Sequence, residues 1–290
     1  MRVYALASSL LLLASSLPGV AQEPPLPDTD TFLEEVRQRL QTDDERQSGY
    51  VYVETRRQLK LERTGRSTKE TVKVFESYPG LPGEEERWDR LVSEDGEPVP
   101  AAELEKQDRE RRRKAQKYVR RLETEAGKVR REHARARQKY ERDMAEAIGE
   151  LFLVYDIRMT GRDAIEGHDT IAFVLTPRPG AKPRTRDGKI MKKFTARAWV
   201  SESDYELVRV DIEAIDTVSI GFGLLARVHK GTRASYTRRK INGEAWLPAR
   251  ASYTASARIG LLKMLRVGGT SEFSGYRKFT VGTSTTYTTK

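Results

Sequence analysis

Few residues in this chain could carry out chemistry. There are three histidines, His133, His168 and His229, and no cysteine. The histidines show no His-x-x-x-His or His-Glu-x-x-His spacing, so no two imidazoles are placed to bind one metal ion. The lack of cysteine excludes disulfides, thiolate metal sites and a cysteine nucleophile. We therefore expect three structural or surface histidines, no metal site and no cofactor.

Other catalytic motifs are missing as well. No Gly-x-Ser-x-Gly or phosphate-loop sequence occurs. Gly221-Phe222-Gly223 lacks the third glycine of a dinucleotide-binding loop and lies in an apolar strand pattern. Charged residues make up 33% of the chain, so no single pair of carboxylates stands out as a glycosidase site. These patterns favour a protein that is not an enzyme.

The first 21 residues predict export. Arg2 precedes an apolar run from Ala5 to Leu17, and small residues at Gly19 and Ala21 follow it, which is typical of a signal peptide cleaved near Ala21. The run is shorter than a membrane-spanning helix needs to be. An exported chain of this size without cysteine is typical of the bacterial periplasm, where we expect this protein.

The mature chain is predicted to begin with a helix and a meander of strands. Thr31 and Glu34 have the spacing of a capping box, and Phe32, Val36 and Leu40 share one helical face. From Tyr50 to Val92 apolar residues alternate with polar ones in three runs. Turns are predicted at Thr64-Gly65, Tyr78-Pro79-Gly80 and Glu94-Asp95-Gly96.

Residues 101–148 differ from the rest in composition. They hold 16 Lys or Arg and 10 Asp or Glu, a charge of +6 that is most of the whole chain's +10. Helix-forming residues dominate, and a thin apolar stripe predicts two helices hinged near Gly127. We interpret this segment as a charged helical insertion in a β domain.

Strand patterns return at Leu151 and continue to the end of the chain. Apolar residues alternate with charged ones at Val208, Val210, Ile212 and Ala214. This alternation indicates a strand with one buried face and one solvent-exposed face. Asn242-Gly243 predicts a type I′ hairpin turn, and Gly268-Gly269 predicts another turn. About ten antiparallel strands with a few helices predict a mainly β (α+β) fold: a large curved sheet or incomplete barrel.

Large apolar side chains on these strands are mostly expected in the core. Several nevertheless occupy consecutive positions, so either both sheet faces are covered or one face lines a cavity. The candidates for a hydrophobic groove are Phe173, Leu175, Trp199, Phe222, Leu224, Leu225, Trp246 and Leu261. Basic candidates for its rim are Lys182, Arg184, Arg186 and Arg233.

The order of these elements resembles a known superfamily. Phe173-Val174-Leu175-Thr176-Pro177, Ala198-Trp199-Val200, Trp246-Leu247-Pro248-Ala249-Arg250 and Tyr276-Arg277-Lys278-Phe279 are similar to strands of the LolA/LolB-like periplasmic lipoprotein carriers, and of outer-membrane lipoprotein-sorting proteins in particular. The resemblance implies one domain over residues 22–290, an incomplete barrel whose concave apolar face is covered by helices. It also implies a cavity for acyl chains. The charged insertion is longer than the family's lid helices.

Two functions remain open from the sequence. The first is a soluble periplasmic protein that carries lipid or lipoprotein acyl chains and whose partners include no nucleic acid. The second is an interaction or sensor protein whose charged helical arm binds an envelope protein or an anionic membrane surface.

Overall fold

The computed structural model describes residues 24–47, 49–62, 64, 66–81, 87–220, 226–259 and 263–279. The predicted signal peptide and the groove candidates Phe222, Leu224, Leu225 and Leu261 lie outside these residues. The described elements are α1 (Thr29–Gln47), β1 (Tyr50–Leu61), β2 (Ser67–Tyr78), β3 (Trp88–Glu94), β4 (Glu97–Pro98), α2 (Ala101–Val154), β5 (Tyr155–Ile165), β6 (His168–Pro177), α3 (Arg186–Met191), β7 (Phe194–Ser201), β8 (Leu207–Ala214), β9 (Val218–Ile220), β10 (Ala226–Val228), β11 (Arg233–Ile241), β12 (Ala245–Ile259) and β13 (Lys263–Lys278).

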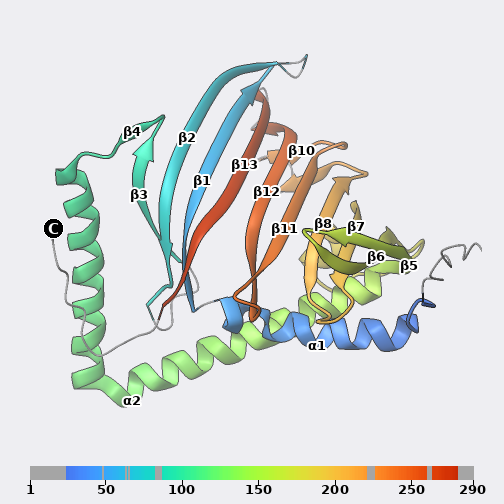
Figure 1. The fold of residues 1–290 in the computed structure, drawn as a ribbon, viewed down its shortest axis with the longest axis horizontal. Coiled ribbons are helices and arrows are strands. Elements are labelled where there is room, and N and C mark those ends of the chain that lie inside the picture. The colour runs from blue at the N-terminus through green and yellow to red at the C-terminus, as the bar shows by residue number, and fades with distance from the viewer. Residues whose placement is uncertain are drawn as a thin grey trace, which may run out of the picture.

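All the strands belong to one curved antiparallel sheet (Figure 1). Its order is β4-β3-β2-β1-β13-β12-β11-β8-β7-β6-β5, and β10 pairs with both β12 and β9 beside this path. Within the described ranges the end strands β4 and β5 do not pair with each other, so the sheet is not a closed barrel. The predicted fold, an incomplete antiparallel barrel with helices, is confirmed.

Helix α1 packs its apolar stripe on one face of this sheet. Phe32 and Val36 are buried against Ile171 and Phe173 of β6, and the rings of Phe32 and Phe173 lie 5.8 Å apart. The predicted capping box is wrong, because the helix begins two residues before Thr31. Asp28 caps it instead, accepting hydrogen bonds from the backbone nitrogen and hydroxyl of Thr31 at 2.9 and 2.7 Å.

Helix α2 contains the predicted charged insertion and connects the two edges of the sheet. Its first part stands beside β3 and β4, and its second part runs past α1 toward β5 (Figure 1). The two parts meet at Glu125, whose φ of −132° and ψ of 34° are not helical. The interruption lies two residues before Gly127, close to the predicted hinge. Of the described helices, none has a stretch long and apolar enough to cross a bilayer.

Two turn predictions have opposite outcomes. Asn242 and Gly243 have φ values of 53° and 70° and connect β11 to β12, as predicted for a type I′ turn. Gly268 and Gly269, predicted to form a turn, instead lie inside the long strand β13. They pair with Thr254 and Tyr253 of β12, so their small size serves packing on the sheet rather than a chain reversal.

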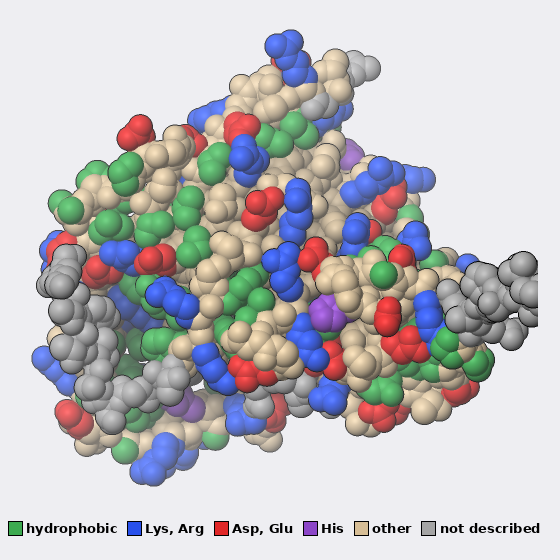
Figure 2. Space-filling view, viewed as in Figure 1, with side chains coloured by type: hydrophobic (Ala, Val, Ile, Leu, Met, Phe, Trp, Pro, Cys, Tyr) green, Lys and Arg blue, Asp and Glu red, His purple; other side chains and the backbone are tan. Residues whose placement is uncertain are grey.

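Charged side chains of both signs are interspersed over the face in view in Figure 2, and hydrophobic side chains gather over β2 and β3. This mixture agrees with the many exposed ion pairs between neighbouring strands, such as Lys73 with Glu94 at 3.0 Å. Exposed pairs of this kind contribute little to stability. The core under α1 is therefore the main apolar support of the fold.

Candidate functional site

Residues directly opposite each other in antiparallel strands project to the same face, so the strand register defines each face. One row runs from Phe173 under α1 through Ala198, Val210, Tyr236 and Ala251 to Ser271 and Arg56. The next row runs from Leu175 through Ala196, Ile212, Ala234 and Tyr253 to Gly269 and Gln58. We call this side the helix-side face. Both rows pass from the core under α1 to more exposed positions such as Ile212 and Tyr253.

A repeated tetrapeptide forms the centre of this face. Ala-Ser-Tyr-Thr occurs at 234–237 on β11 and again at 251–254 on β12. In the antiparallel register Ala234 lies opposite Tyr253 and Tyr236 opposite Ala251, so each ring adjoins a small side chain. The serines and threonines project to the opposite face. This repeat was not among the predicted site features, although it was the signal in the sequence for a site here.

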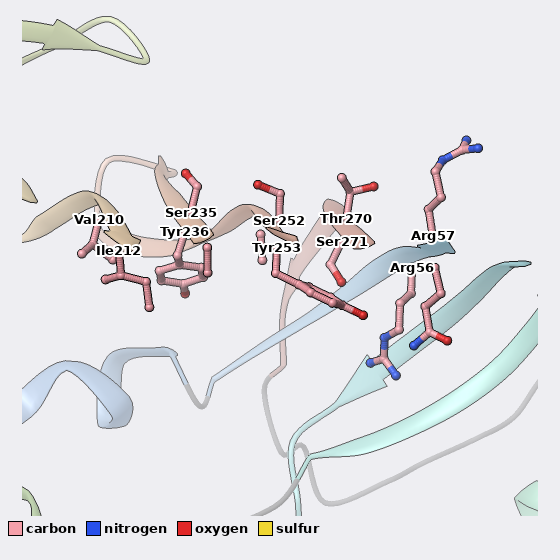
Figure 3. A pocket seen from close by; sticks show the side chains of 13 residues that line it. Arg56, Arg57, Val210, Ile212, Ser235, Tyr236, Ser252, Tyr253, Thr270 and Ser271 are labelled. Carbon is pink, nitrogen blue, oxygen red and sulfur yellow. The ribbon is translucent and has the colours of Figure 1, made fainter. Parts of the chain in front are cut away.

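These residues line a cavity of about 450 Å³ on the helix-side face. Figure 3 shows Val210, Ile212, Tyr236 and Tyr253 on one side of the strands and Ser235, Ser252 and Thr270 on the other. Ile212 is 37% and Tyr253 41% exposed, although neighbouring apolar residues of the same rows are buried under α1. The cavity therefore has an apolar floor that no described element covers, and we call it the helix-side groove.

The far end of the helix-side groove is polar and rigid. Arg56 donates two hydrogen bonds to the buried Glu54, at 2.9 and 2.8 Å, and Ser271 donates a third at 2.6 Å. The guanidinium also lies over the ring of Phe75, 4.6 Å from its centre. The hydrogen bonds to Glu54 raise the pKa of Arg56 above its usual value, so Arg56 keeps its charge at this end.

Gly269 provides the space in which the ring of Tyr253 lies. A Cβ atom at position 269 would be 2.6 Å from Cε1 and 2.8 Å from Cζ of Tyr253. No real Cβ contact is that short, so a side chain here requires the ring to move. The position of Tyr253 between the apolar floor and the Arg56 end thus depends on this glycine.

The four predicted groove residues that the structure describes do not come together in this cavity. Phe173 and Leu175 are buried under α1, at the covered ends of the two rows. Trp199 lies on the opposite face, where its Nε1 donates to Asp163 and the guanidinium groups of Arg197 and Arg209 cover its ring. Trp246 is buried against His168, with ring centres 4.7 Å apart, and its Nε1 donates to Asp204.

The predicted rim residues also lie away from the helix-side groove. Lys182, Arg184 and Arg186 are exposed in and beside the loop from β6 to α3. The buried Glu150 of α2 holds this loop by accepting a hydrogen bond from the backbone nitrogen of Arg184 at 2.8 Å. Arg233 pairs with Glu213 at 3.1 Å and lines a broad hollow of about 870 Å³ on the opposite face.

The histidines lie apart from one another. His133 stacks on Tyr118 within α2, His168 packs on Trp246, and His229 follows β10. In the part of the chain that the structure describes, no group of three His, Cys, Asp or Glu side chains could hold a metal ion. The helix-side groove itself is lined by apolar side chains, hydroxyls, Gln58 and arginines, which suits reversible binding.

Comparison with known proteins gives structural likenesses only. No protein-family model matches the chain, and no curated protein matches it in sequence. Among solved structures, an outer membrane lipoprotein-sorting protein domain from Vibrio parahaemolyticus is 8% identical with a TM-score of 0.34, over 86% of this chain and 93% of that one. A LolA superfamily protein from Nitrosomonas europaea is 8% identical with a TM-score of 0.28, over 89% and 96%.

A DUF1329 family protein from Desulfovibrio piger is 13% identical with a TM-score of 0.28, over 88% of this chain and 94% of that one. Structures named for the superfamily that the sequence resembles are thus among those found. At these identities and TM-scores the likenesses carry no argument about what this chain binds, and the functional reasoning rests on its own residues.

Proposed function

We propose that this protein is a non-catalytic binding protein of the bacterial cell envelope that carries an acyl chain of a lipid or lipoprotein in the helix-side groove. The observation that carries the proposal is the uncovered apolar floor, where Ile212 and Tyr253 are more than a third exposed beside a buried core. Isolated exposed apolar residues are ordinary, but a contiguous strip that lines a concave cavity favours a ligand site.

The chemistry of the floor selects the class of ligand. Val210, Ile212, Ala234, Tyr236 and Ala251 offer a surface with no charged group, along which a hydrocarbon chain can lie. Each buried CH₂ contributes about 0.8 kcal/mol, so one chain can be held without a charged anchor. The polar end at Arg56, Gln58 and Ser271 would face the head of an amphiphile. The cavity of about 450 Å³ lies within the usual range of ligand pockets.

Adjacent residues of β12 allow a matched test. Ala251 faces the helix-side groove, whereas Ser252 faces the opposite side of the same strand. Ala251→Glu would place a carboxylate on the apolar floor, and we expect it to weaken binding of a fluorescent fatty acid by about tenfold or more. Ser252→Glu adds the same charge on the opposite face of the strand, to which the Ser252 side chain projects, and should leave the affinity within about twofold.

The native ligand can be sought directly. The chain would be purified from a periplasmic fraction and extracted with organic solvent, and the extract analysed by mass spectrometry. A stoichiometric acyl species supports the proposal and names its class. A clean extract, together with no uptake of offered fatty acid by the wild-type chain, would overturn it.

A further inference from the structure

The first part of α2 is fixed to the sheet edge by one of its faces. The side chain of Gln107 donates to the carbonyl of Leu91 at 3.1 Å and accepts from its backbone nitrogen at 3.0 Å, as a neighbouring strand would. Asp108 accepts two hydrogen bonds from Arg90, at 2.8 and 3.1 Å. Arg111 donates to the carbonyl of Pro79 at 3.0 Å. The orientation of the helix about its own axis is thereby set.

The opposite face of the same part carries a row of cations. Lys106, Arg109, Arg113, Lys117 and Arg120 recur at spacings of three or four residues, so they share one side of the helix. At roughly 100° per residue, Arg113 lies roughly 200° around the axis from Arg111, which faces the sheet. All five side chains are exposed. We call this row the basic stripe; it extends over about 21 Å.

Three members of the basic stripe are not neutralised by ion pairs. Lys106 and Arg109 pair with Glu103 and Glu105 at 3.3 and 3.7 Å. Within the described ranges, Arg113, Lys117 and Arg120 make no ion pair. Farther along α2 the pattern differs, because Arg137 pairs with Glu141 and Lys139 with Asp143.

We propose that the basic stripe docks this protein on an anionic bilayer surface. The stripe is straight, exposed and positive, which complements the diffuse negative charge of a layer of anionic headgroups. The other positions on this face are the small Ala102, the polar Thr124 and the acidic Glu110, and none of them is a large apolar residue. The stripe therefore lacks the apolar centre expected of a specific protein interface, which favours a membrane over an acidic protein partner.

The test uses the full chain and sedimentation with vesicles. The wild-type chain should bind vesicles of phosphatidylcholine mixed with phosphatidylglycerol, should not bind pure phosphatidylcholine, and should lose binding as salt rises. Each basic residue near an anionic surface changes the partition coefficient of the protein onto vesicles about fivefold. Arg113→Gln, Lys117→Gln and Arg120→Gln together should therefore reduce this partition coefficient about 100-fold.

A matched variant separates the basic stripe from net charge. Arg137→Gln, Lys139→Gln and Arg142→Gln remove the same charge from the second part of α2 and should reduce binding by less than about fivefold. Equal losses of vesicle binding in the two triple variants would overturn the proposal. So would a variant of Arg113, Lys117 and Arg120 that binds vesicles as well as the wild type does. The proposal would also be overturned if the wild-type chain does not bind anionic vesicles but crosslinks through position 117 to an envelope protein. The Ala251→Glu variant should still bind these vesicles, because docking does not depend on the groove.

Discussion

The contact of Tyr253 with Gly269 makes a residue-level prediction. Gly269→Ala would place its Cβ 2.6 Å from the ring, which must then leave its site. We expect the change to lower the free energy of unfolding by about 1 to 3 kcal/mol, as overpacking does. In a Tyr253→Ala background the same change should instead raise it by about 0.5 to 1 kcal/mol, because alanine orders a strand more readily than glycine. Urea unfolding of the wild type, the two single variants and the double variant measures the sign of the stability change in each background.

That sign reversal is specific to the contact. Gly268→Ala serves as a control, since a Cβ there would be at an ordinary distance of 3.4 Å or more from its neighbours. If Gly269→Ala cost the same stability with and without the ring of Tyr253, the glycine would be required for another reason. The ring would then not depend on it for its place in the helix-side groove.

Single residues also mark how far the sequence could predict the site. The alternation of Val208, Val210 and Ile212 correctly indicated one apolar face of β8, but did not reveal that Ile212 stays outside the core under α1 and is exposed. Which apolar residues a helix covers depends on where it crosses the sheet, and local periodicity holds no information about that. Trp199 and Trp246 were predicted to line the groove because of their size. The indole nitrogen of each instead donates a hydrogen bond to a carboxylate from a distant segment, Asp163 for Trp199 and Asp204 for Trp246.

At the scale of elements, Tyr155 joins the start of β5 to the end of α3. Its hydroxyl donates to the carbonyl of Met191 at 2.7 Å, and burial raises the pKa of Tyr155 from 10.0 to about 12. A folded-state pKa above the unfolded value favours the neutral form. The resulting stability is complete below pH 10 and is lost as pH rises toward 12.

Tyr155→Phe should therefore change how stability depends on pH. Below pH 10 we expect a loss of about 1 kcal/mol, because the Met191 carbonyl loses its donor. Between pH 10 and 12 the variant should lose up to about 2 kcal/mol less than the wild type, since it has no hydroxyl to ionise there. Urea midpoints across this range provide the measurement, and parallel curves for the two proteins would contradict the assignment.

Elements were predictable where their determinants are local. The Asn242-Gly243 turn and the helical character of residues 101–148 follow from backbone preference and composition. The Gly268-Gly269 pair was misassigned because glycine is common both in turns and where a ring packs on a strand. Only the pairing of β12 with β13 distinguishes the two cases, and that pairing joins residues 14 to 16 positions apart rather than the neighbours of the two glycines.

For the whole molecule, the chain order places the first strands against the last. β1 pairs with β13 from Tyr50 opposite Lys278 to Lys60 opposite Val267. The strands before α2 therefore form one edge of the sheet, and the strands after α2 form the other. No local pattern in the sequence predicts this register, because pairing across more than two hundred residues depends on the complete set of faces and edges.

A cut in α2 tests how strongly the two parts of the chain hold each other. The part before Glu125 contacts the rest through α1 on β6 and through the ladder of β1 with β13. After cleavage at a protease site introduced at residues 125–127, we expect both fragments to elute together from gel filtration in native buffer. Unfolding should become bimolecular, so the urea midpoint should rise with concentration only in the cut protein. Fragments that separate without denaturant would show that α2, rather than the sheet, holds the molecule together.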